Sequence, residues 1–226
     1  MAWRSHGRDN NDLIDNMKRN GLLKSDRVIE AMKKVDRANY LRLKSDAYYD
    51  APSPIEFGAT ISAPHMHAYA AENLLPLCKS GAKILDVGSG SGYTCAVFHH
   101  LVEDGTVIGI DHIPELVHFS VQNLRSDGLG AQIDGDRIKM VVGDGRQGYP
   151  ESGPYNVIHV GASAPALPQA LVEQLARPGR MFIPVGEGEQ YIWQVDKDEH
   201  GSVKKTKLFG VRYVPLTDRQ SQQPYL

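Results

Sequence analysis

The fold of this chain is decided by residues 83–92, which read KILDVGSGSG. Aliphatic residues fill most of the first five positions, which is typical of a short buried strand. Glycines follow at 88, 90 and 92, and apolar residues then recur at helical spacing through 96–102. A strand, a glycine-rich turn and a helix in this order predict an α/β domain with a parallel sheet.

The spacing of these glycines bears on the ligand. A dinucleotide-binding turn reads G-x-G-x-x-G, whereas Gly88, Gly90 and Gly92 form G-x-G-x-G, which disfavours a nicotinamide dehydrogenase. Asp86 lies just before the turn. A carboxylate beside closely approaching glycines suits S-adenosylmethionine, whose amino-acid end is cationic and which carries no phosphate. The same glycines would serve an ordinary strand–helix turn with positive φ angles, so this motif alone leaves both interpretations open.

Acidic residues close the two strands predicted next. Residues 106–111 end in Asp111, which either caps the following helix or accepts hydrogen bonds from ribose hydroxyls; the neighbouring glycine motif favours the ribose role. The third strand, 137–145, ends in Gly143, Asp144 and Gly145, where the acid would accept from an adenine amino group. Ligands of parallel sheets bind at the carboxyl ends of the strands, so these residues predict one nucleoside site.

Further elements complete the predicted sheet and its surroundings. Strands are expected at 155–161 and 180–185, with a helix over 167–175 and an exposed loop at 126–136. Residues 191–195 and 207–214 predict an antiparallel hairpin joined to the sheet. Two amphipathic helices are expected near the N-terminus, the first capped at Asn10 or Asn11. We therefore expect a single domain over 1–226, with an N-terminal helical brace (1–58), a cofactor-binding α/β core (59–186) and a C-terminal hairpin with a tail (187–226).

Residues 59–67, ATISAPHMH, form the second informative stretch. Ser62 is a good helix N-cap and Pro64 then falls in the first turn, so an ordinary capped helix accounts for the pattern. A helix N-terminus flanked by the hydroxyls of Thr60 and Ser62 would also bind an anion such as a carboxylate. His65 and His67 are two positions apart and point to different helix faces, so we expect no metal site.

Composition excludes several classes of function. The 25 Lys and Arg residues nearly balance the 27 Asp and Glu residues, which argues against nucleic acid as a general partner. Cys78 and Cys95 form no disulfide framework and no zinc motif, in keeping with a reducing compartment. No apolar leader or 18-residue apolar run occurs, so we expect no membrane association and a soluble cytosolic protein. With no coiled-coil pattern, a monomer is the default expectation.

Taken together, these segments resemble the protein-L-isoaspartate (D-aspartate) O-methyltransferase family, and in particular its animal form. The resemblance covers nearly the whole chain. The glycine turn is shared by many methyltransferases, whereas the Thr-Ile-Ser-Ala-Pro-His sequence is more discriminating. The segments that carry the resemblance are 59–67, 85–92, 109–112, 143–145, 159–162 and 214–218.

The resemblance implies a Rossmann-like, S-adenosylmethionine-dependent methyltransferase fold with a seven-stranded, mostly parallel sheet. Ser62 matches the active-site serine of the family, and the substrate groove would fall on Thr60, Ser62 and Val214. S-adenosyl-L-methionine, which leaves as S-adenosyl-L-homocysteine, would be held by the following residues: Ala59, Thr60, Ile61, Ser62, His67, Asp86, Gly88, Ser89, Gly90, Asp111, His112, Gly143, Asp144, Thr217 and Gln222.

The implied reaction is methylation of the free α-carboxylate of L-isoaspartyl and D-aspartyl residues in damaged proteins, giving an ester that promotes return to L-aspartyl. A carboxylate with a pKa of about 3.5 to 4 is already ionised at pH 7, so no general base is needed. Two other classes remain to be weighed. A nucleobase-amine methyltransferase would commonly carry Asn/Asp-Pro-Pro-Tyr where this chain has 159–162. A binding module that holds cofactor or damaged chains without turnover is not excluded by sequence.

Overall fold

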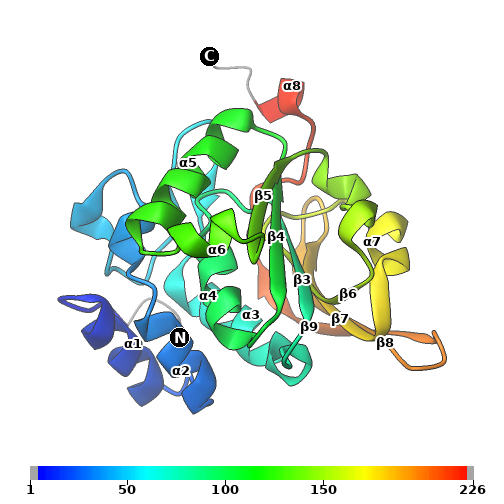
Figure 1. The fold of residues 1–226 in the computed structure, drawn as a ribbon, viewed down its shortest axis with the longest axis horizontal. Helices are drawn as coiled ribbons and strands as arrows, with labels where there is room; N and C mark the ends of the chain where they lie inside the picture. The colour runs from blue at the N-terminus through cyan, green and yellow to red at the C-terminus, as the bar shows by residue number, and fades with distance from the viewer. Residues whose placement is uncertain (1–4, 223–226) are drawn as a thin grey trace.

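The structure is a computed structural model that describes residues 5–222. Its centre is a seven-stranded sheet in the order β5-β4-β3-β6-β7-β8-β9 (Figure 1). The first five strands of that order run parallel, whereas β8 and β9 are antiparallel to their neighbours. The strands are β3 (Lys83–Val87), β4 (Thr106–Asp111), β5 (Ile138–Val142), β6 (Tyr155–Val160), β7 (Leu175–Val185), β8 (Gln190–Lys197) and β9 (Val203–Val211). The predicted Rossmann-like fold with an antiparallel C-terminal hairpin is confirmed.

The central strands β3, β4 and β6 bury side chains on both faces of the sheet. Ile84 packs into one hydrophobic cluster and Leu85, the next residue, into another, as the alternation of side chains along a strand requires. The first cluster lies under α3 (Pro64–Leu74), α4 (Tyr93–Leu101) and α5 (Pro114–Ser126), and the second under α7 (Gln169–Glu173). Because both faces are covered, the strands read as nearly continuous apolar runs.

The N-terminal helices α1 (Asn10–Arg19) and α2 (Asp26–Lys33) belong to the first of these clusters. Met17 and Met32 are fully buried, and Phe98 of α4 lies in the same cluster. The cap of α1 is Asp9, whose side chain accepts from the Asp12 amide, and not Asn10 or Asn11 as predicted. Asn10 instead donates to the carbonyls of α2 and its end, because it faces the neighbouring helix.

Two predicted elements were wrong in extent. The helix expected over 167–175 is only Gln169–Glu173, because Lys197 donates to the carbonyls of Val172, Glu173 and Leu175 and the chain then enters β7. Residues 126–136 are not simply a loop, since they hold the short helix α6 (Gly130–Asp134), which an ion pair between Arg125 and Asp134 ties to α5.

The end of the predicted hairpin also differs, in a way that shapes the site. The strand expected to reach Val214 stops at Val211. Beyond it, the Val214 carbonyl accepts from the Ser163 amide at 2.8 Å, and the Leu216 amide donates to the Ser163 carbonyl at 2.8 Å. These bonds draw residues 214–216 onto the loop that follows β6, at the carboxyl edge of the sheet.

The remaining elements are short. A two-stranded ribbon pairs β1 (Ser53–Pro54) with β2 (Thr60–Ile61), and α8 (Arg219–Gln222) closes the described part of the chain. Single turns of 3-10 helix lie at Arg37–Tyr40, Lys44–Asp46, Leu75–Leu77, Gly145–Gln147 and Pro150–Ser152. No helix within residues 5–222 has the length and apolar character needed to cross a bilayer.

Candidate active site

The site lies where the strand order changes direction. The chain goes from β3 outward to β4 and β5, and later returns to the other side of β3 with β6. A crevice therefore opens at the carboxyl ends of β3, β4 and β6, the usual ligand position in such sheets. Gly88 follows β3 with a φ of +70°, and its amide donates to the Ile110 carbonyl at 2.9 Å. The backbone of this turn requires positive φ angles, which glycine adopts readily. This requirement does not depend on which ligand the turn binds.

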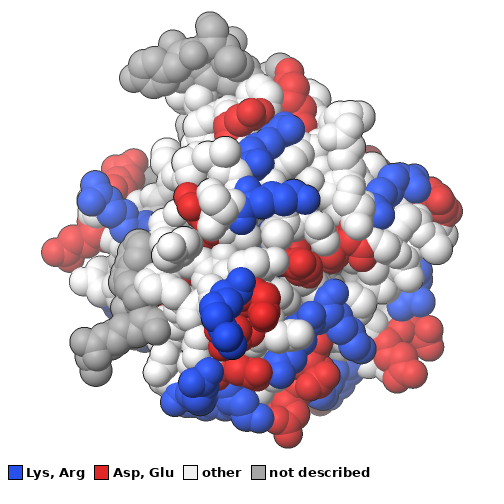
Figure 2. All heavy atoms as spheres, turned by 90° about the vertical axis from the view of Figure 1, so that its left-hand side faces the viewer, with Lys and Arg blue, Asp and Glu red and all other residues white. Residues whose placement is uncertain are grey.

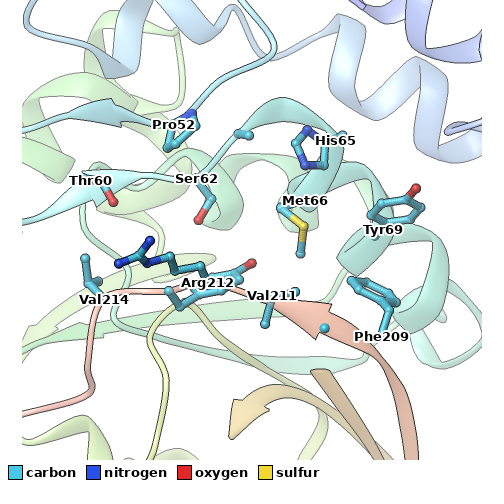
Figure 3. Close-up of a pocket in the computed structure, with 14 residues that line it drawn as sticks. Pro52, Thr60, Ser62, His65, Met66, Tyr69, Phe209, Val211, Arg212 and Val214 are labelled. Atoms are coloured by element: carbon cyan, nitrogen blue, oxygen red, sulfur yellow. The ribbon is translucent and has the colours of Figure 1, made fainter. Parts of the chain in front are cut away.

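Three connected hollows open along this edge, and Thr60 and Gly161 line all three. The largest is a groove of about 560 Å³ between the start of α3 and the residues around the end of β9 (Figure 3). A narrower outer hollow runs from Thr60 to Asp111, His112 and Thr217. A third, inner hollow lies between Ser62, His67 and the glycine turn. We call them the groove, the outer hollow and the inner hollow.

Gly161 marks the closest approach of two backbones at this junction. Its amide donates to the Val87 carbonyl at 2.8 Å, and a Cβ atom at this position would lie 2.9 Å from the Gly88 carbonyl oxygen. Any side chain here would push the loop after β6 away from the glycine turn. The lack of a side chain at Gly161, which lines both the groove and the inner hollow, thus allows the two backbones to lie this close.

The inner hollow carries polar atoms that the protein itself does not fully use. The Ser89 hydroxyl is buried and has no hydrogen-bond partner among the described residues. Thr94 lies 3.2 Å from Nδ1 of His67, whose Nε2 makes no well-formed hydrogen bond. Burial holds the pKa of His67 well below its usual value, aided by the positive charge of Arg37, although the Ser62 carbonyl opposes this. The ring is therefore neutral near pH 7. Such a hollow offers hydrogen bonds to a polar, amino-acid-like group.

The outer hollow is organised by Asp111. One carboxylate oxygen accepts from the Gly90 amide and the other from the Ile113 amide, both at 3.1 Å. Burial raises the pKa of Asp111, and the two amide hydrogen bonds oppose that rise. Each oxygen keeps a lone pair for a further donor. Asp111 is not the cap of α5, because the N-cap is Ile113 and has no side-chain cap; its carboxylate binds the Ile113 amide and lines the hollow.

Comparison with known proteins decides the family. The protein-L-isoaspartate(D-aspartate) O-methyltransferase family matches residues 8–221. A protein-L-isoaspartate O-methyltransferase of Caenorhabditis elegans is 46% identical over 98% of both chains. Protein-L-isoaspartate O-methyltransferase 1 of Arabidopsis thaliana is 45% identical over 94% of this chain and 93% of its own. The chain belongs to this family.

A solved structure agrees with this assignment. A protein from Plasmodium falciparum, described as a protein-L-isoaspartate O-methyltransferase in complex with S-adenosyl-L-homocysteine, superimposes with a TM-score of 0.85. It is 34% identical, and the match covers 93% of this chain and 99% of that one. The family predicted from sequence is therefore confirmed, and an animal member is among the similar relatives.

Most of the cofactor residues expected of a family member line the two narrower hollows. The outer one is lined by Ala59, Thr60, Gly88, Gly90, Asp111, His112, Thr217 and Gln222, and the inner one by Thr60, Ile61, Ser62, His67, Gly88, Ser89 and Gly90. The exceptions are Asp86, Gly143 and Asp144, none of which lines any of the three hollows.

Asp86 faces the protein interior. It is 1% exposed, and its oxygens accept from Nδ1 of His159 at 2.6 Å and from the Cys95 thiol at 3.2 Å. His159 in turn lines the inner hollow. The carboxylate of Asp86 therefore does not line the hollows itself, and it reaches the inner hollow only through its partner His159.

Asp144 is committed to its own turn. Its carboxylate accepts from the side chain and the amide of Arg146, and the Arg146 guanidinium lowers the pKa of that carboxyl. Gly145 lines the outer hollow in place of Gly143. Gln222 spans the outer hollow, with its Oε1 2.7 Å from Nε2 of His112 and its amide donating to the Phe57 carbonyl at 3.1 Å.

The start of α3 corrects the role predicted for Ser62. The helix N-cap is Ala63, with no side-chain cap, so Ser62 lies one residue before it. The helix amides are also not free for a ligand. Pro64 has no N–H, the His65 amide donates to Asp50 at 2.9 Å, and the Met66 amide donates to the Ala63 carbonyl at 2.9 Å. An internal carboxylate, Asp50, thus takes the place of the predicted anion.

The hydroxyls of Thr60 and Ser62 remain, and both point into the groove (Figure 3). Tyr213 joins them, because a hydrogen bond links its hydroxyl to the Ser62 side chain. Burial raises the pKa of Tyr213 to about 12, and the Ser62 bond opposes that rise, so the phenol keeps its proton near pH 7. Sequence reasoning missed Tyr213, although it directly precedes the marked segment 214–218.

His65 and His67 lie in different hollows, as their spacing predicted. His65 lines the groove and places Nδ1 2.7 Å from Asp50, whereas His67 lines the inner hollow. Within residues 5–222, no group of three or more His, Cys, Asp or Glu side chains is placed to hold a metal ion.

Proposed function

We propose that this protein transfers a methyl group from S-adenosyl-L-methionine to the free α-carboxylate of L-isoaspartyl and D-aspartyl residues in damaged polypeptides. The supporting observation is the junction at Thr60 and Gly161, where a wide groove meets two narrow polar hollows. The groove suits an extended polypeptide, and the hollows suit the two polar ends of an adenosyl amino acid. Family membership supports the same reaction.

The residues present fit that cofactor. The buried Ser89 hydroxyl lacks a partner, and with His67 it would hold the amino-acid end. Asp111 would accept hydrogen bonds from the ribose hydroxyls. When bound, S-adenosyl-L-methionine supplies an electrophilic methyl group on a positively charged sulfur and leaves as S-adenosyl-L-homocysteine.

The remaining task of the protein is to position the acceptor. A carboxylate with a pKa of about 3.5 is ionised near pH 7, so no residue has to remove a proton. Ser62 and Thr60 would donate hydrogen bonds that orient it toward the inner hollow, and Tyr213 would orient the Ser62 hydroxyl. The apolar groove wall would exclude water, which strengthens the attraction between the carboxylate and a sulfonium. The methyl ester then promotes return of the residue to L-aspartyl.

A test pairs two peptides of identical composition, one with an isoaspartyl and one with an ordinary aspartyl residue. With labelled cofactor, we expect label only on the isoaspartyl peptide, released in mild alkali as an ester would be. Alkali-stable label would indicate an amine acceptor, and binding of both ligands without label would indicate a binding module. Either result would overturn the proposal.

Together with this reaction we propose an active-site residue, a substrate site, a cellular location, an oligomeric state and the domain boundaries. Ser62 is the active-site residue, and Thr60, Ser62 and Val214 form the substrate site. The protein acts in the cytosol as a monomer, on polypeptides and not on nucleic acids, and 1–226 is one domain divided at 58 and 186. The balanced total of basic and acidic residues supports the absence of nucleic-acid substrates, as does their interspersed arrangement on one face (Figure 2). Sedimentation at micromolar concentration checks the monomer, and an added oligonucleotide should not compete with the peptide.

A further inference from the structure

The groove combines a mostly apolar wall with hydroxyl groups and one permanent positive charge. Its lining is dominated by Pro52, Ala63, Met66, Tyr69, Phe209 and Val211, and it contains no Asp or Glu among the described residues. Arg212 lines the same groove and is exposed. Figure 3 shows its guanidinium extending along the groove toward the side where Thr60 and Val214 lie.

Arg212 has no partner of its own in the described part of the chain. Neither an ion pair nor a hydrogen bond joins its guanidinium to another described residue, whereas Arg146 and Arg180 each hold an aspartate at 2.8 Å or less. An arginine presents a planar set of donors that matches a carboxylate, and an exposed guanidinium is accessible to a ligand that enters the groove. A negative group brought in by a ligand is therefore its natural partner.

The backbone that carries Arg212 is held on both sides. Residue 211 is the last of β9. The Tyr213 amide donates to Oε1 of Gln190 at 2.6 Å, and Nε2 of the same side chain donates to the Tyr213 carbonyl at 3.1 Å. Val214 is then bonded to Ser163. The backbone from which the Arg212 side chain extends is thus anchored by β9 before it and by the bonds of Tyr213 and Val214 after it.

We propose that Arg212 makes this protein select isoaspartyl polypeptides that carry an acidic side chain within two residues of the damaged site. The inference rests on the proposed function and names its substrate class. The damaged carboxylate itself is assigned to Thr60 and Ser62, so the charge of Arg212 is available for a neighbouring side chain. For a partly exposed pair, we expect a preference of about three- to tenfold over a neutral neighbour.

The experiment measures kcat/KM for a set of isoaspartyl hexapeptides with one neighbouring position, from two before to two after the damaged residue, occupied by Glu or by Gln. The wild-type protein is compared with Arg212→Gln, which removes the charge and keeps a polar side chain. Lys205→Gln is the matched control, because Lys205 is also an exposed cation of β9 but lines none of the three hollows. We expect a higher kcat/KM for Glu than for Gln at one or more positions, loss of that difference in Arg212→Gln only, and its weakening in high salt.

The outcomes separate this inference from the function on which it rests. No methylation of any isoaspartyl peptide would contradict the proposed function. Equal kcat/KM for Glu and Gln peptides in the wild type would contradict the role of Arg212 alone. A uniform fall over all peptides in Arg212→Gln would also contradict it, because it would show that the guanidinium acts on the damaged carboxylate. Retention of the preference in Arg212→Gln would assign the selectivity to another residue.

Discussion

Single hydroxyls and carboxylates control the site at the scale of residues. Ser62 lines both the groove and the inner hollow, and Tyr213 bonds to its side chain. Ser62→Ala should lower kcat/KM on an isoaspartyl peptide by about ten- to a hundredfold, since a hydrogen bond to a charged group contributes about 1.5–3 kcal/mol. The affinity for S-adenosyl-L-homocysteine, measured by calorimetry, should change much less. Ser126→Ala, at the exposed end of α5, is the control, and turnover by Ser62→Ala equal to that of the control would refute this role.

Asp111 leads to a pH prediction. In the proposed cofactor site its ionised form would accept from the ribose hydroxyls, and protonation would replace an acceptor with a donor. Because burial raises the pKa of Asp111 above 3.8 in the folded protein, its charge is lost on acidification at a higher pH than that of an ordinary carboxyl. The affinity for S-adenosyl-L-homocysteine should therefore decrease as the pH is lowered, with a midpoint above pH 3.8. Asp111→Asn should bind more weakly at pH 7 and lose this step. If the variant keeps the same step, another group is responsible.

At the scale of elements, the start of α3 depends on Asp50. This carboxylate is fully buried, accepts from the His65 amide, and lies 2.7 Å from the His65 ring. The buried Arg37 is close enough for its charge and that of Asp50 to interact. Asp50→Asn should lower the free energy of unfolding by about 2–4 kcal/mol, because it weakens the helix start and removes a buried countercharge. Urea unfolding measures this. Asp46→Asn, at an exposed position, should change it by less than about 0.5 kcal/mol, and an equal effect of both variants would contradict the prediction.

The elements also show what a sequence can reveal. The strand, turn and helix of 83–101 were predictable because Ile84, Leu85 and the glycines form a local pattern. The end of α7 was not predictable from the sequence. Lys197, whose side chain donates to the carbonyls at that end, lies on β8, far along the chain. The same holds for the site. Thr60, Ser62 and Asp111 stand in recognisable motifs, whereas Asp50 lies in a proline-containing loop and reaches α3 only in the folded chain. The inward orientation of Asp86 depended on His159, a partner 73 residues away.

At the scale of the whole molecule, the N-terminal helices share one core with the sheet. Met32 of α2 is fully buried in the cluster that includes Phe98. Met32→Ala should lower the free energy of unfolding by about 2–5 kcal/mol, and the N-terminal helices should unfold in the same urea transition as the sheet. Circular dichroism and tryptophan fluorescence measure the two transitions. Val203→Ala, at an exposed position of β9, is the control. Separate transitions for helices and sheet would show that 1–58 is an independent unit, contrary to the single domain proposed.

The carboxylate of Asp50 at the start of α3 also affects reactivity. A bound anion surrounded by strong donors is stabilised, but its lone pairs become less nucleophilic. In this protein the His65 amide at the start of α3 already serves Asp50, so an acid group bound at the proposed site would meet hydroxyls and not free helix amides. Hydroxyl donors alone would orient that carboxylate and leave its lone pairs more nucleophilic than a set of helix amides would.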